Sequence, residues 1–280
     1  MADFCGGWPR RYVALADRPG PRGSDHSMSS TTTAQRVRLQ IPNQHGAWAF
    51  LLIPLILGFV VTGWSLPAGL FAVAWVLAYP ASYYLGRAVV IRWRRGSWSR
   101  LAKRELRYAV PWIGLAAVPS LALVILRPWL LIVGIVLGGL WFVSVWLTRT
   151  GHERGASNDL LLVTQAALAV PLLWAIGRDE WPSQDAWLAA FICLVFFTGS
   201  VVHVKSLIRE ADDPRWARFS RVYHVAALGI GLLSPWLLLP FGAAALRAFL
   251  VPAGSRPAVV GAVEIVVSVL VIMGTTLALS

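Results

Sequence analysis

The sequence predicts an all-α protein, a polytopic transmembrane helical bundle with about eight spans. Of its 280 residues, 57% are hydrophobic and only 14% are charged, and eight long apolar stretches follow one another along the chain. A hydrocarbon core about 30 Å thick needs about 20 apolar residues per helix, with about 17 to 25 tolerated. Strands of a membrane barrel would instead alternate apolar and polar residues over about ten positions. Helical spans therefore explain the pattern better than strands do.

The apolar stretches give the expected order of the helices. They cover residues 47–61, 66–85, 108–126, 128–147, 160–176, 186–204, 222–240 and 258–279. The first and fifth are short for a complete crossing and need flanking residues. The two longest basic loops lie four spans apart, which suggests two four-helix halves of the kind that transporters and intramembrane enzymes use.

The uneven distribution of Lys and Arg predicts the orientation. The segments before the first stretch and after the second, fourth and sixth contain 6, 8, 2 and 5 of the 25 basic residues, whereas the intervening loops contain 0, 1, 1 and 2. The positive-inside rule places the rich set in the cytoplasm. The sequence therefore predicts a cell-membrane protein with an even number of spans and with both the N-terminus and the C-terminus in the cytoplasm.

The +12 formal charge is explained by the membrane and not by nucleic acid. Its residues lie in short loops beside apolar spans, where anionic lipid headgroups attract them, so the expected partners are membrane lipids and no nucleic acid. Cys5 lies in a polar segment and Cys193 in an apolar one. The two cysteines therefore indicate neither a disulfide framework nor a thiolate metal site. No metal and no cofactor are expected.

The chain divides into two regions by composition. Residues 1–40 are rich in Gly, Pro, Ser, Thr and Arg without periodicity, which predicts a disordered basic cytoplasmic tail. Within it, Met28 begins a polar run typical of a start, so residues 1–27 are interpreted as a possible over-extension of the reading frame. Residues 41–280 form the predicted membrane-embedded helical domain.

Polar side chains that are costly within a bilayer gather at the predicted cytoplasmic ends of the spans. The candidate catalytic residues, chosen because imidazole and carboxylate groups transfer protons, are His45, Glu153, Asp159 and Glu210. The candidate substrate-binding residues are Asn43, Gln44, Arg87, Arg154, Asn158, Lys205, Arg209 and His224. Two simpler explanations stay open: the Asn and Asp residues cap helices, and Arg87 marks topology.

The densest polar cluster follows the sixth stretch. If that helix continues, Lys205 and Arg209 share one face at i, i+4, while His203, Ser206 and Glu210 line another. One face would then hold an anion and the other would handle a proton. The alternative is a solvated amphipathic extension whose ion pairs contribute little.

Three motifs together resemble the YwiC-like family of bacterial membrane proteins. They are the run at 42–48, the Glu153–Arg154 pair with Asn158 and Asp159 after it, and the stretch 205–210. The likeness covers about residue 41 to the C-terminus, and it implies a class of protein and positions for a site without naming a reaction.

More distantly, the arrangement resembles UbiA-type intramembrane prenyltransferases, which are helical bundles with a cytoplasm-facing cavity. That family holds diphosphate through magnesium bound by Asp-rich motifs. Asp159 is followed four residues later by Val163, so the motif is missing and metal-dependent prenyl transfer is not expected.

Three classes of function follow from these patterns. The best match is a cytoplasm-facing intramembrane cavity that binds or modifies an anionic or isoprenoid lipid, and whether it is an enzyme stays open. A small-molecule or ion transporter is the second, although the middle of the spans offers few polar groups. The third is a haem-binding or assembly subunit, for which His203 and His224 lie at similar depth. Glu264 stands alone in the last stretch, where a carboxylate must be protonated or paired.

Overall fold

The computed structural model describes residues 39–42, 45–151 and 155–280, and the regular elements of these residues are all helical. The long helices are α2 (His45–Thr62), α3 (Leu66–Arg95), α4 (Arg100–Leu126), α5 (Leu130–Arg149), α6 (Ala156–Arg178), α7 (Gln184–Val204), α8 (Pro214–Ala227), α9 (Leu238–Leu250) and α10 (Pro257–Leu279). A π-helical turn, η1 (Lys205–Arg209), extends α7, and two short 3₁₀ turns, η2 (Leu228–Leu232) and η3 (Pro235–Leu237), join α8 to α9. The all-α prediction is confirmed.

Serine side chains begin three of the long helices. The hydroxyls of Ser65, Ser99 and Ser183 accept hydrogen bonds from the amide three residues later, at 3.3, 3.3 and 3.2 Å. Each bond satisfies one of the amides that the first turn of a helix leaves without a partner. Gly96 ends α3 with φ 68°, a left-handed conformation that favours glycine, and the chain then turns into α4.

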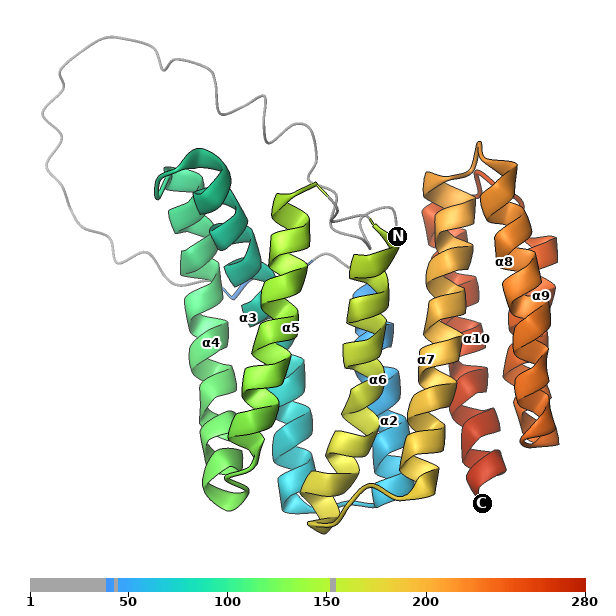
Figure 1. Cartoon of the computed structure of the whole chain (residues 1–280), viewed down its shortest axis with the longest axis horizontal. Coiled ribbons are helices and arrows are strands. Elements are labelled where there is room, and N and C mark those ends of the chain that lie inside the picture. The colour runs from blue at the N-terminus through green and yellow to red at the C-terminus, as the bar shows by residue number, and fades with distance from the viewer. Residues whose placement is uncertain (1–38, 43–44, 152–154) are drawn as a thin grey trace, which may run out of the picture.

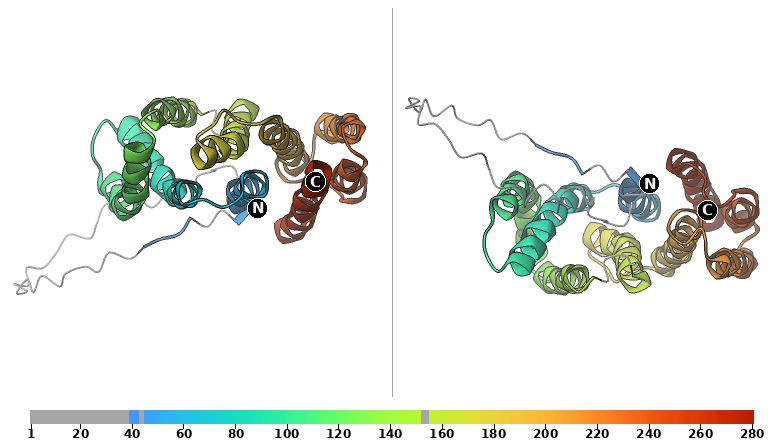
Figure 2. Two further views of the ribbon diagram at one scale, coloured as in Figure 1. Left: turned by 90° about the horizontal axis from the view of Figure 1, so that it is seen from below. Right: turned by 90° about the horizontal axis from the view of Figure 1, so that it is seen from above.

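The centre of the bundle is formed by α2, α6 and α7. Leu57 of α2, Val170 of α6 and Phe197 of α7 belong to one buried apolar cluster, which also includes Phe241 of α9 and Val271 of α10. Figure 2 shows α3, α4 and α5 on one side of this centre and α8, α9 and α10 on the other. Because α2 packs against α6 and α7, the packing crosses the boundary between the two suggested four-helix halves.

The helices run between two ends, which we call upper and lower as they stand in Figure 1. The upper end includes the connections α3–α4, α5–α6, α7–α8 and α9–α10. Arg94 donates to the Thr148 carbonyl there at 2.6 Å, and the Gly254 amide donates to the Leu207 carbonyl at 2.9 Å. At the lower end, Arg178 Nε donates to the Thr62 carbonyl at 2.8 Å.

The predicted span at residues 222–240 is not one helix, and this corrects the sequence analysis. The chain leaves α8 after Ala227, turns through η2 and η3, and returns as α9 antiparallel to α8 (Figure 1). Ser234 is extended, with φ −163° and ψ 137°, because the following Pro235 disfavours a helical conformation at the residue before it. The apolar stretch at residues 222–240 thus contains a turn between two helices, which its hydropathy did not indicate.

This hairpin changes the expected placement of the C-terminus. Since α9 returns to the upper end, α10 runs downward, and the C-terminus lies at the lower end (Figure 1). The described chain thus enters α2 at the upper end and finishes at the lower end, and the cytoplasmic placement of both termini stays a prediction, because residues 1–38 fall outside the described part. Among the Lys and Arg residues that the structure describes, only Arg127 and Arg178 lie at the lower end, so the charge asymmetry is sharper than the sequence suggested.

Six helices are long and apolar enough to cross a membrane: α3, α4, α5, α6, α7 with η1, and α10. Two shorter apolar helical segments, Trp48–Thr62 and Pro235–Leu250, accompany them. In contrast, α8 carries Arg215, Arg218 and Arg221. The chain is therefore a multi-pass helical membrane protein. Six of its described helices have the length and the apolar composition of a membrane span, and the other helices lie beside them.

Candidate functional site

Two of the predicted polar clusters meet at the upper end, between the first turn of α6 and the π-helical turn η1 that follows α7. Asp159 Oδ2 lies 2.5 Å from Lys205 Nζ, and the two side chains are only 3% and 5% exposed. Asp159 is in the first turn of α6, where a negative charge also interacts favourably with the helix dipole. The structure thus brings together residues that are 46 positions apart in the sequence.

A π-helical turn places Lys205 in this pair. The Glu210 amide donates to the Lys205 carbonyl at 2.9 Å, a bond that spans five residues instead of the four of an α-helix. Ser206 Oγ donates to the His203 carbonyl at 2.7 Å inside the same turn. The predicted i, i+4 stacking assumed a continuous α-helix and does not describe this segment. Single π turns of this kind are frequent at functional sites.

Two further contacts connect the surroundings of the Asp159–Lys205 pair to α5 and α8. Asn158 Oδ1 accepts a hydrogen bond of 2.7 Å from Ser144 Oγ of α5. Lys205 Nζ also lies 5.8 Å from the centre of the Trp216 ring in α8, within the range of a cation–π contact. Ser144 and Trp216 were missed by the sequence analysis, because a serine in an apolar span and an interfacial tryptophan carry no distinctive signal.

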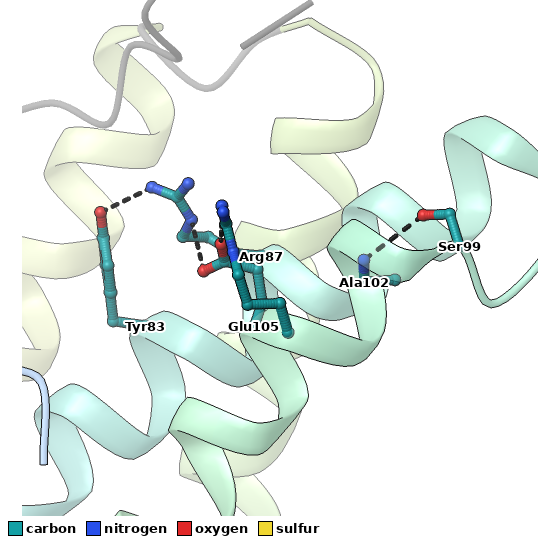
Figure 3. Close-up of polar contacts among 6 residues, drawn as sticks. Tyr83, Arg87, Ser99, Ala102 and Glu105 are labelled. Carbon is teal, nitrogen blue, oxygen red and sulfur yellow. Dashed lines mark hydrogen bonds and ion pairs between the residues drawn. The ribbon is translucent and has the colours of Figure 1, made fainter. Parts of the chain in front are cut away.

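A second polar group joins α3 and α4 (Figure 3). Arg87 Nε lies 3.1 Å from Glu105 Oε2, and Arg87 Nη1 donates to the Tyr83 hydroxyl at 2.9 Å. Glu105 Oε1 also lies 3.3 Å from Arg104 Nη2. The Glu105 side chain is 4% exposed, so this carboxylate is buried between two cations. Arg87 was a candidate, but its partner Glu105 was not identified from the sequence.

His224 belongs to a different cluster from the Asp159–Lys205 pair. Its ring contacts the His203 ring edge to face, with centroids 5.7 Å apart, and its Nδ1 lies 2.7 Å from the Ser220 carbonyl. In the haem hypothesis these two imidazoles would flank a porphyrin. Because the rings contact each other directly, they fill the space that a porphyrin between them would need.

The other candidates have different outcomes. Arg209 and Glu210 lie at the end of η1, both partly exposed, close in sequence to the buried Lys205. The predicted sites at Asn43, Gln44, Glu153 and Arg154 fall outside the described residues. His45 opens α2, but its side chain also falls outside them.

Comparison with known proteins identifies the family. The chain is 30% identical over 239 residues to "Uncharacterized protein YwiC" of Bacillus subtilis (strain 168), an alignment covering 81% of this chain and 92% of that protein. The chain belongs to the YwiC-like family. The family model for YwiC-like proteins matches residues 41–174. An "Uncharacterized protein" of Haemophilus influenzae is 25% identical over 203 residues, covering 72% of this chain and 82% of that one.

No solved structure matches the chain. Its helices and its relatives make the chain a multi-pass helical membrane protein of the YwiC-like family. Its family model covers the Asn158–Asp159 pair, while Lys205 lies beyond the matched residues and within the half of the chain that includes α7 to α10.

Proposed function

We propose that this YwiC-like protein binds or modifies an anionic or isoprenoid lipid at its upper end, and that this end faces the cytoplasm. The observation that carries the proposal is the Asp159–Lys205 pair, buried beside the π-helical turn at the border between the apolar spans and the basic connections. Ionisable groups at such depth in a membrane protein are costly and typically functional.

The charge of the upper end supports an anionic headgroup. The described cations there include Arg87, Arg94, Lys205 and Arg209, whereas the two described basic residues of the lower end lie far from them. Phosphate oxygens accept charge-assisted hydrogen bonds from lysine and arginine, and such bonds are about twice as strong as neutral ones. By the positive-inside rule, this end faces the cytoplasmic leaflet.

Stability alone does not explain why this pair is buried. Replacing a buried ion pair by apolar side chains of similar volume is often neutral or stabilising, while removing one partner is strongly destabilising. A protein that only needed to pack α6 against α7 would be served as well by apolar residues. In the proposed site, Asp159 balances the charge of Lys205, so Lys205 acts as a hydrogen-bond donor to the headgroup and the neighbouring Arg209 contributes the net positive charge. Asp159 is also the carboxylate placed to accept a proton if the lipid is modified.

The experiment measures lipids that co-purify with the protein. Wild type and the double variant Asp159→Leu/Lys205→Met are extracted in mild detergent and compared by native mass spectrometry, with added phosphatidylglycerol, an isoprenyl phosphate or zwitterionic phosphatidylethanolamine as probes. Since a hydrogen bond to a charged group contributes about 1.5 to 3 kcal/mol, we expect the double variant to bind the anionic probes about tenfold or more weakly.

The control is Arg215→Gln, which removes an exposed cation of α8 outside the buried pair. This variant should bind both anionic probes as wild type does. Equal affinity of wild type and the double variant for both anionic probes would show that the pair is not part of a lipid site.

A further inference from the structure

A second buried polar cluster lies between α7, α8, α9 and α10, apart from the Asp159–Lys205 pair. Its members are less than a tenth exposed and come from all four helices: Ser200 and His203 of α7, Ser220 and His224 of α8, Arg247 of α9, and Glu264 and Ser268 of α10. Polar side chains in the interior of a membrane bundle are rare and commonly functional. The proposed lipid site does not use this cluster, so its polar groups need an explanation of their own.

The charges of the cluster are matched by an ion pair. Arg247 Nη1 lies 2.5 Å from Glu264 Oε1, and the two side chains are 3% and 6% exposed. The pair leaves no excess negative charge for a metal cation and no excess positive charge for an anion. Among the residues that the structure describes, no group of three or more His, Cys, Asp or Glu side chains is arranged to hold a metal. The charge balance therefore favours a neutral ligand.

Three atoms of the cluster have no hydrogen-bond partner within the described part of the chain. They are Ser220 Oγ, His224 Nε2 and Arg247 Nε, and the side chains that carry them are 1%, 2% and 4% exposed. Buried polar atoms without partners are uncommon in native proteins and typically mark an internal water, an ion or a functional group. The three atoms thus indicate a ligand inside the cluster.

The donors and acceptors among these atoms define the chemistry of the ligand. The Ser220 carbonyl, 2.7 Å from His224 Nδ1, can only accept a hydrogen bond, so Nδ1 carries the hydrogen. Nε2 of the neutral ring is then an acceptor, whereas Arg247 Nε is a donor and the Ser220 hydroxyl can be either. A ligand that satisfies these atoms must both donate and accept hydrogen bonds, as a hydroxyl group or a water molecule does.

The acceptor on His224 and the donor on Arg247 face adjacent residues of α7. A Cβ at Gly199 would lie 3.1 Å from His224 Nε2, so this edge of the imidazole lies close to the glycine backbone. Arg247 Nη2 donates to Ser200 Oγ at 3.0 Å, and Nε lies on the same edge of the planar guanidinium as Nη2. Both groups are therefore directed towards one turn of α7.

We propose that this cluster binds internal water. The water donates a hydrogen bond to His224 Nε2 and accepts one from Arg247 Nε, and the Ser220 hydroxyl completes the site. A buried water needs only about two to four polar partners and little space. The hydroxyl of a lipid has the same hydrogen-bonding chemistry but brings a larger molecule into a cluster that is less than a tenth exposed. Bound water also hydrates the Arg247 guanidinium, which reduces the cost of burying its charge.

The experiment is oxidation of side chains by hydroxyl radicals that a brief X-ray pulse generates from water. The full-length protein is purified in mild detergent, exposed to the pulse and digested, and the oxidised residues are identified by mass spectrometry. Hydroxyl radicals react close to where they form, so a buried side chain is oxidised when water lies next to it. We expect His224 to be oxidised although its side chain is buried.

Cys193 provides the matched control for burial. It lies seven residues before Ser200 on the same face of α7, is 0% exposed and belongs to the apolar cluster at the centre of the bundle. A thiol reacts with hydroxyl radicals faster than an imidazole does, yet Cys193 should stay unmodified because its surroundings are apolar. A radical scavenger in the bulk solution should protect the exposed Trp181 and leave the oxidation of His224 unchanged.

Two variants test the proposed acceptor. His224→Phe removes Nε2, whereas His224→Gln keeps an acceptor on the side chain. His203, whose ring contacts that of His224 with centroids 5.7 Å apart, reports on the water in both variants. Its oxidation should be lost in His224→Phe and kept in wild type and in His224→Gln.

The measurement on the wild-type protein stands by itself if either variant does not fold. The proposal is overturned if His224 of the wild type stays unmodified, which is also the result expected for a lipid hydroxyl in place of water. Protection of His224 by the bulk scavenger would overturn it as well, since the radicals would then come from the surrounding solution. Equal oxidation of His203 in the two folded variants would show that His224 Nε2 does not hold the water.

Discussion

Replacing Asp159 by Asn should destabilise the protein far more than the same substitution at Asp179. Both carboxylates lie in interhelical ion pairs, 2.5 Å from Lys205 in one and 2.9 Å from Arg127 in the other. The side chain of Asp159 is 3% exposed and that of Asp179 is 55% exposed. The two variants make the same chemical change at a buried pair and at an exposed one.

Burial sets the difference in magnitude. At 2.5 Å and an effective dielectric constant of about 20, the attraction of the buried pair is about 7 kcal/mol before desolvation is subtracted. At 2.9 Å in water it is about 1 kcal/mol. Removing one partner of a buried pair typically reduces the free energy of unfolding by about 3 to 5 kcal/mol. Because asparagine still accepts a hydrogen bond, we expect a loss of about 3 kcal/mol for Asp159→Asn and less than about 1 kcal/mol for Asp179→Asn.

The assay is reversible unfolding in mixed detergent micelles, followed by tryptophan fluorescence. Asp159→Asn should change the unfolding equilibrium constant by about a hundredfold. The double variant Asp159→Leu/Lys205→Met should recover most of the loss, since neither charge is then left buried. If Asp159→Asn costs no more than Asp179→Asn, the pair is hydrated in the membrane and the reasoning about its burial fails.

Three other predictions follow from the packing and the topology. Gly199→Ala should destabilise the protein by about 1 to 3 kcal/mol in the same assay, because the new Cβ would lie 2.9 Å from a Tyr223 ring carbon. In the control Gly138→Ala the new Cβ meets nothing within 4 Å, so this variant should be neutral or stabilising. In a variant without Cys5, a cysteine at Ser280 should react with a membrane-impermeant maleimide added outside cells and one at Gly254 should not; the reverse pattern would contradict the path of α10. Glu105→Gln should increase protease cleavage between α3 and α4, since its two arginine partners lose their shared carboxylate; unchanged cleavage would contradict this.

The sequence was most informative where a signal was local. Apolar runs gave the positions of α3 and α10, and the short polar motifs singled out Asp159 and Lys205, which the structure places in one ion pair. Length and hydropathy are properties of a single segment, and polar residues at the ends of spans are rare enough to be noticed.

Partners across helices could not be predicted in the same way. Glu105 lies among many cations in a basic connection, so nothing in the sequence shows that it is buried. Glu264 was compared with Arg256, the cation nearest in sequence, whereas its partner Arg247 lies on the preceding helix. Such pairs depend on how helices pack, and packing is not readable from spacing.

The seventh apolar run failed for a different reason. Hydropathy averages over a window, and the residues after Val222 are apolar enough to hide two glycines and the Ser234–Pro235 turn. Such a turn adds one passage from end to end of the bundle. Every helix after it therefore runs in the direction opposite to the predicted one. The end of the bundle at which the described chain finishes therefore depends on the short turn between Ala227 and Leu238, which an average over about 19 residues cannot resolve.

The hairpin of α8 and α9 also constrains how the protein is made. A nascent α8, with three arginines, is too polar to enter lipid from the translocation channel by itself, and α9 contains Arg247. The carboxylate that matches Arg247 belongs to α10, which is synthesised after both of these helices. We therefore expect α8, α9 and α10 to enter the membrane together, and a chain cut before α10 should have its α8 and α9 degraded.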